Sequence, residues 1–304
     1  MGLIPEAFAR STVAREGDAG EAWLAELPGI VEDLLGHWDL ERDGDVLHGQ
    51  VGVVVPVRGD AVLKVSFPHP GNVHEPDAFE AWDGRGAVKL YERDDARYAM
   101  LLERAHPSTL VEHTGDLAAI AGDLLGQLTI PAPDGLPRMS EKADTWAEDL
   151  HKDAAELDHP LPDVVVREAM AAVDELCRDQ PETLVHGDFH SSNILRAERE
   201  PWLAVDPKGY VGDPAFDAAI FLRTRAYHLY LAGAGDLPRT LRTELDQFAE
   251  ASGVDAVRIR RWCQLIVVQS AFWGRRHGFG RARTGAQLDR VIAVIDELAV
   301  SWTD

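Results

Sequence analysis

The chain has 304 residues, of which 45% are apolar and 27% charged, a composition that predicts a soluble globular protein of one or two domains. It carries 30 Lys and Arg residues against 52 Asp and Glu, a formal net charge of −22. This acidity argues against a nucleic-acid-binding protein and against an anionic membrane surface as partner, because both require a basic face. A small cationic partner is compatible with the charge, and solubility alone would also account for it.

The cysteine content and the apolar segments indicate a cytoplasmic protein. Cys177 and Cys263 are too few for a disulfide framework and lack zinc-type spacing. The N-terminal sequence MGLIPEAFAR has no signal-peptide pattern, and the most apolar run, residues 265–273, is shorter than the roughly 18 residues of a membrane span. We therefore expect no membrane partner, and we take a monomer as the default oligomeric state.

Strand-like patterns dominate the N-terminal third. The β-branched runs at 51–57 and 61–67, separated by Arg58-Gly59-Asp60, predict a β-hairpin. Three further elements are expected before residue 104: a short helix at about 75–83 and strands at about 87–91 and 97–103. These elements would form an antiparallel sheet with one inserted helix.

From about residue 109 the pattern becomes helical. Apolar residues at three- and four-residue spacing between 117 and 128 predict a helix with Thr114 as its N-cap. Further helices are expected at about 141–157, 164–179, 214–232, 238–251, 255–276 and 285–301. One β segment, 183–206, interrupts them. The fold class is therefore α+β, with an N-terminal lobe at 1–105 and a larger helical lobe at 106–304.

The β segment carries the chemistry. Two short apolar strands, 194–195 and 202–205, predict a hairpin whose outer ends meet. Asn193 precedes the first strand and Asp206 follows the second, so both should offer oxygen ligands at one point, as Mg²⁺ requires. Asp188, five residues before Asn193, can face the same point as a base. This combination is typical of ATP-dependent phosphoryl transfer.

The sequences HGDFHSSNIL (186–195) and VDPKGYVGDPAFD (205–217) resemble the two motifs of the aminoglycoside phosphotransferase family, a branch of the kinase-like fold. Their Asp-x-x-x-x-Asn spacing is that of the protein-kinase catalytic loop. The segments similar to the streptomycin 6-kinase and hydroxyurea kinase group are 21–44, 61–67, 78–94 and 100–105. The resemblance implies a protein-kinase-like fold of two lobes and an ATP- and Mg²⁺-dependent kinase that phosphorylates hydroxyl groups.

The same resemblance implies roles for the motif residues. Asp188 would orient the attacking hydroxyl or accept its proton, and Asn193 and Asp206 would hold Mg²⁺. The turn bounded by Gly49 and Gly52 would cover the phosphates, although it lacks the Gly-x-Gly-x-x-Gly pattern of protein kinases.

The nucleotide contacts follow in the same way. Lys64 matches the sheet lysine that meets the α- and β-phosphates, and Glu75 is its expected ion-pair partner, with Glu80 as the alternative. The backbone of Glu103 and Ala105 would contact adenine. A lysine that only protects a sheet edge remains the structural alternative for Lys64.

Several neighbouring residues have structural explanations. We expect His186 to support the catalytic loop, Asp213 to cap the following helix and Asp217 to brace the loop by hydrogen bonding. For His190 a structural hydrogen bond is favoured, and Lys208 could either meet phosphate or point outward.

The substrate contacts are less sharply defined by the sequence. Asp144 and Glu148 lie on an acidic stripe that could bind ammonium or guanidinium groups, but a solvated helix face explains them as well. Trp273 and His277 are further candidates for the pocket wall.

The resemblance implies a small, cationic, streptomycin-like antibiotic as the substrate, so that the activity would confer resistance. Hydroxyurea, a tuberactinomycin-type peptide antibiotic and a small metabolite are the alternative acceptors. A non-catalytic nucleotide-binding module is the alternative from another class. A metallophosphoesterase is disfavoured because the sequence lacks further ligand clusters for two metals.

Overall fold

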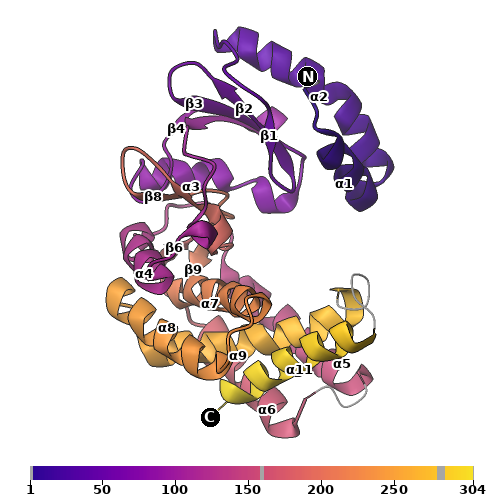
Figure 1. Cartoon of the computed structure of the whole chain (residues 1–304), viewed down its shortest axis with the longest axis vertical. Coiled ribbons are helices and arrows are strands. Elements are labelled where there is room, and N and C mark those ends of the chain that lie inside the picture. Colours follow the sequence, from indigo (N-terminus) through magenta and orange to yellow (C-terminus); the bar gives the residue numbers. More distant parts are fainter. Residues whose placement is uncertain (1–2, 158–160, 279–284, 304) are drawn as a thin grey trace. The chain divides into compact units, whose positions relative to one another are not determined.

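The computed structural model describes residues 3–157, 161–278 and 285–303. The chain divides into two compact units, which we call the sheet unit (Met1–Pro107 and Leu195–Lys208) and the helical unit (Ser108–Ile194 and Gly209–Asp304). The sheet unit thus contains a segment of the chain that follows the catalytic-loop motif (Figure 1).

A five-stranded antiparallel sheet forms the centre of the sheet unit. Its strands lie in the order β1 (Leu47–His48), β2 (Gly52–Val57), β3 (Ala61–Ser66), β5 (Ala99–Glu103) and β4 (Leu90–Asp94). The predicted hairpin is β2 and β3, and Lys64 pairs across the sheet with Val54 and Met100. Because side chains alternate along a strand, Leu63 and Val65 face the core while Lys64 faces the opposite side.

Two N-terminal helices cover the core face of this sheet. Helices α1 (Glu6–Glu16) and α2 (Asp18–His37), which the sequence patterns did not reveal, bury Phe8, Leu27 and Leu34 against the sheet valines. Helix α3 (Glu75–Trp82) is the inserted helix that was predicted. Its first residue reaches Lys64, on the side of the sheet opposite to the core.

The hairpin of β7 (Ile194–Arg196) and β8 (Trp202–Ala204) is present as predicted. Ala204 accepts a hydrogen bond from Val88 N and donates one to Gly86 O, so the hairpin is joined to the sheet unit by its backbone. This contact engages the segment around Val88. The predicted strand at 87–91 is therefore displaced and observed as β4, which begins at Leu90 and contains a bulge.

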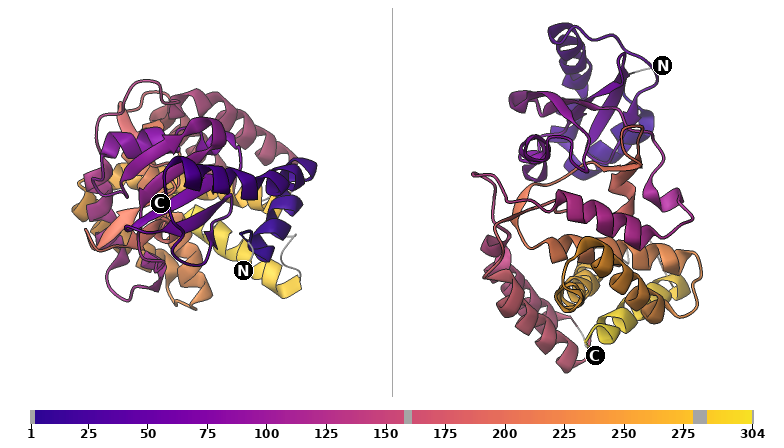
Figure 2. Two further views of the ribbon diagram at one scale, coloured as in Figure 1. Left: turned by 90° about the horizontal axis from the view of Figure 1, so that it is seen from above. Right: turned by 90° about the vertical axis from the view of Figure 1, so that its left-hand side faces the viewer.

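The helical unit contains the predicted helices with small differences at their ends. They are α4 (Leu117–Leu128), α5 (Ala143–Glu156), α6 (Asp163–Ala172), α7 (Pro214–Leu231), α8 (Leu237–Ser252), α9 (Ala256–Trp273) and α11 (Gly285–Ser301). A two-stranded ribbon, β6 (Thr183–Val185) with β9 (Tyr210–Gly212), lies among them. Figure 2 shows α11, in yellow, beside the orange helices α8 and α9, against which it packs.

Local chemistry explains the differences at the helix ends. The N-cap of α4 is Asp116, which accepts from Ala119 N at 3.1 Å, so the prediction of Thr114 was wrong. Helices α6 and α9 end earlier than predicted, because their last turns widen into π-helical turns at Val173–Cys177 and Gly274–Gly278. Short 3₁₀ turns occur at Pro70–Asn72, Asp95–Arg97, Leu110–Glu112, Met139–Lys142 and Ser191–Asn193. No helix within the described ranges combines the length and hydropathy needed to cross a membrane.

Candidate active site

Lys64 is the buried centre of an ionic cluster in the sheet unit. The residue is only 6% exposed. Its ammonium group contacts Glu75 Oε1 and lies 2.5 Å from Asp206 Oδ1. Burial alone would lower the pKa of Lys64, but the two carboxylates outweigh it and hold the pKa above its ordinary value. Lys64 is therefore a fixed positive charge rather than an edge residue in solvent.

Glu75 is positioned for this contact by the start of α3. It is the first residue of the helix, is followed by Pro76 and is 2% exposed. Burial raises the pKa of Glu75, and the charge of Lys64 acts in the opposite direction. Glu80, the alternative partner, lies on the exposed side of α3 and pairs with Arg93 instead. Of the two carboxylates, only Glu75 contacts Lys64.

Asp206 enters the cluster because the hairpin β7–β8 returns the chain to the sheet unit. Its backbone adopts a φ of +61°, in the left-handed region, and its side chain is half-exposed. One carboxylate oxygen meets Lys64, while the other faces the turn at Gly49, where a Cβ would lie 4.0 Å from Oδ2. The carboxylate can therefore offer an oxygen to a metal ion from the cluster, and its hard-donor chemistry suits Mg²⁺.

In the turn between β1 and β2, the last residue, Gly52, has no room for a side chain. Gly49 N donates to Gly52 O at 3.0 Å, which closes the turn. A Cβ on Gly52 would come within 2.7 Å of Val65 O and 2.9 Å of Ser66 Oγ. This close approach keeps the turn tight beside Asp206, where the phosphates of a nucleotide were expected.

The segment predicted to meet adenine follows β5. Both the backbone N–H and the carboxylate of Glu103 are used in hydrogen bonds within the sheet unit. The N–H donates to Lys89 O, and the carboxylate accepts from Arg199 and from Lys89 N. Beyond it, Arg104 N and His106 N donate to backbone carbonyls of the sheet unit. Ala105 lies between these two anchored residues and is half-buried. Arg199 was not singled out from sequence, where an arginine in a hairpin turn gives no signal of its contact with Glu103.

Asp188 and Asn193 lie together in the helical unit. Asn193 Nδ2 donates to Asp188 O at 3.0 Å and approaches Asp188 Oδ2 at 3.5 Å. Because the amide nitrogen is used in this way, the amide oxygen is turned away from Asp188 and can serve as a ligand. This donor set also fits Mg²⁺, which prefers oxygen ligands. The side chain of Asp188 is half-exposed, as a group that meets a substrate must be.

Asp217 and His186 support the loop that carries Asp188. The two carboxylate oxygens of Asp217 accept from His186 N and Gly187 N, both at 2.8 Å, and His186 Nδ1 accepts from Asp188 N at 3.3 Å. Both supporting roles are therefore confirmed. Gly187 has a φ of +82°, a conformation that favours glycine. Burial raises the pKa of Asp217 to about 7, and its backbone hydrogen bonds act in the opposite direction.

Asp213 caps α7, as predicted, by accepting from Ala215 N at 3.0 Å. It also accepts from Arg258 Nε and Trp262 Nε1, both at 2.5 Å, so it joins α7 to α9. No local sequence pattern indicates these two distant partners. His190, for which a structural hydrogen bond was favoured, places Nε2 3.5 Å from Asp188 Oδ1.

The predicted substrate residues do not converge. Asp144 is exposed and pairs with Arg178 at 2.7 Å, and Glu148 is exposed on the same helix. Trp273, 63% exposed, has its ring 5.8 Å from that of His277. Arg276, next to His277, pairs with Asp153 and Glu156 near the other end of α5, about 13 and 18 Å along the helix from Asp144.

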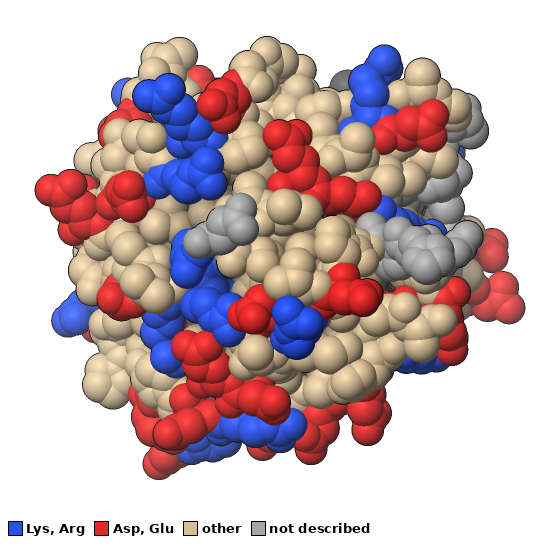
Figure 3. All heavy atoms as spheres, turned by 90° about the horizontal axis from the view of Figure 1, so that it is seen from below, with Lys and Arg blue, Asp and Glu red and all other residues tan. Residues whose placement is uncertain are grey.

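The charge distribution agrees with a largely solvating role for the carboxylates. Figure 3 shows acidic and basic side chains interspersed over one face, without a field of one sign.

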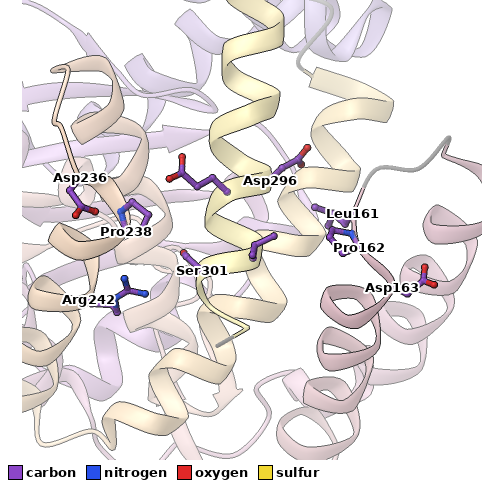
Figure 4. A pocket seen from close by; sticks show the side chains of 10 residues that line it. Leu161, Pro162, Asp163, Asp236, Pro238, Arg242, Asp296 and Ser301 are labelled. Atoms are coloured by element: carbon purple, nitrogen blue, oxygen red, sulfur yellow. The ribbon is translucent and has the colours of Figure 1, made fainter.

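A hollow of about 1000 Å³ lies between the N-terminal ends of α6 and α8 and the second half of α11 (Figure 4). Asp163, Asp236 and Asp296 are among its lining residues, and none of the predicted site residues lines it.

Comparison with known proteins gives consistent matches over most of the chain. Residues 37–278 match the model of the aminoglycoside/hydroxyurea antibiotic resistance kinase family. The streptomycin 6-kinase of Streptomyces glaucescens is 35% identical, over 90% of this chain and 92% of that protein. The hydroxyurea phosphotransferase of Kitasatospora aureofaciens is 34% identical, over 89% and 79% respectively. Among solved structures, the GDP and kanamycin complex of APH(2")-IIia matches with a TM-score of 0.54 at 14% identity, over 90% of this chain and 98% of that one.

Proposed function

The chain belongs to the aminoglycoside/hydroxyurea antibiotic resistance kinase family, and from this premise we propose that it transfers the γ-phosphate of ATP to a hydroxyl group of a streptomycin-like antibiotic. It has the kinase-like fold and is a phosphotransferase with an alcohol group as acceptor. The proposal adds the nucleotide, the metal, the acceptor and the residues that act on them.

The observation that carries the proposal is the cluster of Lys64, Glu75 and Asp206. A buried ammonium held by two carboxylates is a preorganised positive charge, which stabilises phosphate oxygens without reorganisation when they arrive. Glu75 fixes the lysine in this position. In this proposal the N-terminal lobe, 1–105, binds the nucleotide, with the backbone of Glu103 and Ala105 at the adenine.

Two residues would hold the magnesium ion. Asn193 and Asp206 supply an amide oxygen and a carboxylate oxygen, the donors that suit it. When bound, Mg²⁺ neutralises negative charge on the phosphates of ATP. Gly49 and Gly52 keep the neighbouring turn compact, so that backbone N–H groups can approach the phosphates.

Asp188 performs the proton step on the acceptor. The acceptor hydroxyl attacks the γ-phosphorus, the bond from that phosphorus to the ADP oxygen breaks, and Asp188 takes the hydroxyl proton. Asn193, His186 and Asp217 hold the loop on which Asp188 lies. The helical lobe, 106–304, binds the acceptor. The candidate acceptor contacts are Asp144, Glu148, Trp273 and His277.

A streptomycin-like acceptor is favoured, and hydroxyurea is the second candidate. The supporting observation is that a streptomycin 6-kinase and a hydroxyurea phosphotransferase match this chain at 35% and 34% identity, respectively. Phosphorylation adds negative charge to a cationic antibiotic, so the activity would confer resistance. We place the reaction in the cytoplasm, where ATP is available, and propose a monomeric enzyme.

The test is ADP release by the whole chain with Mg-ATP and a panel of acceptors: streptomycin, hydroxyurea, a tuberactinomycin-type peptide and choline. We expect turnover with streptomycin. Turnover of hydroxyurea with no reaction of streptomycin would replace the proposed acceptor and keep the chemistry. Tight binding of Mg-ATP without turnover of any acceptor would instead support a non-catalytic nucleotide-binding module.

A further inference from the structure

A cavity lies beside Glu75, the buried partner of Lys64, within the sheet unit. It has a volume of about 290 Å³ and lies between the N-terminal end of α3 and strands β3 and β5. Its polar wall includes Ser66 and Glu75, and its apolar wall includes Val73, Pro76 and Met100. The size suits a compact molecule smaller than an ordinary drug-sized ligand.

Ser66 leaves a polar group without a partner at this cavity. The residue is 1% exposed, and its Oγ makes no hydrogen bond with any residue that the structure describes. A buried hydroxyl left in this state costs free energy, because it has lost water without gaining a partner. A donor or acceptor that reached this hydroxyl would supply the missing partner.

Glu75 adds a negative group to the same wall. Its Oε1 is engaged by Lys64, and over the described part of the chain no donor engages its Oε2. Nearby, Asp77 and Asp95 share the single charge of Arg93, so the wall as a whole carries more negative than positive charge. Such a wall attracts a cation, while the apolar lining residues suit a hydrocarbon body.

We infer that this cavity is a binding site for a small organic cation, such as an amidinium, guanidinium or primary ammonium group on an apolar body. The cation donates to Glu75 and to the unpartnered hydroxyl of Ser66, and the apolar part lies against Val73, Pro76 and Met100. None of the residues assigned to the phosphates or to the acceptor is needed for this binding, apart from Glu75.

Glu75 couples this site to Lys64. A second cation beside the same carboxylate weakens its hold on the ammonium of Lys64, so a bound ligand should lower the affinity for Mg-ATP, and Mg-ATP should lower the affinity for the ligand by the same factor. This coupling rests on the proposed role of Lys64 at the phosphates. The binding itself does not.

The probe is benzamidinium, with benzamide as its uncharged isostere, and binding to the whole chain is measured by calorimetry. We expect one benzamidinium per chain and at least tenfold weaker binding of benzamide. Ser66→Ala, which removes only the unpartnered hydroxyl, should weaken benzamidinium binding at least tenfold, since it removes a hydrogen bond to a charged group. Val73→Trp, at the half-exposed rim, should block the site.

The matched control is Glu80→Gln, which removes an exposed carboxylate of the same helix outside the cavity and should leave binding unchanged. Near-UV circular dichroism verifies the fold of each variant, and Ser66→Ala carries the test if Val73→Trp does not fold. Equal affinity of wild type, Ser66→Ala and Val73→Trp would overturn the inference, as would no binding to wild type. Binding that behaves as expected without any effect on Mg-ATP affinity would overturn only the coupling, and so would bear on the role of Lys64.

Discussion

Asp206 Oδ1 lies 2.5 Å from Lys64 Nζ, although 142 residues separate the two in the chain. The contact exists because the segment Leu195–Lys208 leaves the helical unit and joins the sheet unit. Backbone hydrogen bonds of Ala204 and the contacts of Arg199 with Glu103 hold that segment. A residue expected to bind metal and a residue expected to bind phosphate are therefore in direct contact.

Lys64→Met should destabilise the fold as well as nucleotide binding. The substitution leaves the buried Glu75 without its counter-charge, which typically costs about 3–5 kcal/mol. Urea unfolding should show this loss, and calorimetry should show weaker Mg-ATP binding. The double variant Lys64→Met/Glu75→Gln should recover part of the stability but none of the affinity. Full additivity of the two losses in stability would contradict a direct ion pair.

Stability should depend on pH through Asp217. The pKa of this group is about 7 in the folded chain against 3.8 for an ordinary aspartate, so between these values the folded chain holds a proton that the unfolded chain has released. Its stabilising contribution is therefore complete below about pH 4 and is lost as the pH rises through about 7.

The measurement compares wild type with Asp217→Asn, which cannot titrate. The free energy of unfolding of wild type minus that of the variant should fall by up to about 4 kcal/mol from pH 4 to pH 8. Denaturant titrations at several pH values give this difference directly. A difference that is constant, or that grows with pH, would show that Asp217 is ionised throughout.

Gly52→Ala should disturb the turn beside Asp206. The added Cβ would lie 2.7 Å from Val65 O, so β2 must shift, at a cost of about 1–3 kcal/mol. We expect a higher KM for ATP and an unchanged KM for the acceptor. The matched control is Gly29→Ala in α2, where the new Cβ meets nothing within 4 Å. This substitution should raise the free energy of unfolding. An unchanged KM for ATP in Gly52→Ala would separate this turn from the nucleotide.

Local signals predicted much of the fold. Alternating β-branched residues predicted the β2–β3 hairpin, and apolar periodicity predicted α4 and the later helices. The supporting roles of His186 and Asp217 followed from residues close to the catalytic motif in the sequence. In each case the pattern lies within a short stretch of chain, where side-chain spacing determines the local structure.

Features that depend on distant partners were not predictable. Helices α1 and α2 become clear only from the sheet they cover, and α1 has little apolar periodicity of its own. The contacts of Asp213 with Arg258 and Trp262, and of Arg199 with Glu103, join residues 45 or more positions apart. Asp116, and not Thr114, is the N-cap of α4 because the helix begins at Leu117. Only the residue next to that start can reach the free N–H groups of the first turn.

The most direct test of the central claim is the turnover of Asp188→Asn with Mg-ATP and the best acceptor of the panel. The substitution keeps the shape of the side chain and removes its ability to take a proton. We predict a loss of turnover of at least about 100-fold, the usual contribution of a general base, with Mg-ATP affinity within twofold of wild type. Turnover near the wild-type rate, at unchanged Mg-ATP affinity, would contradict the assignment of Asp188 as the residue that activates the acceptor hydroxyl.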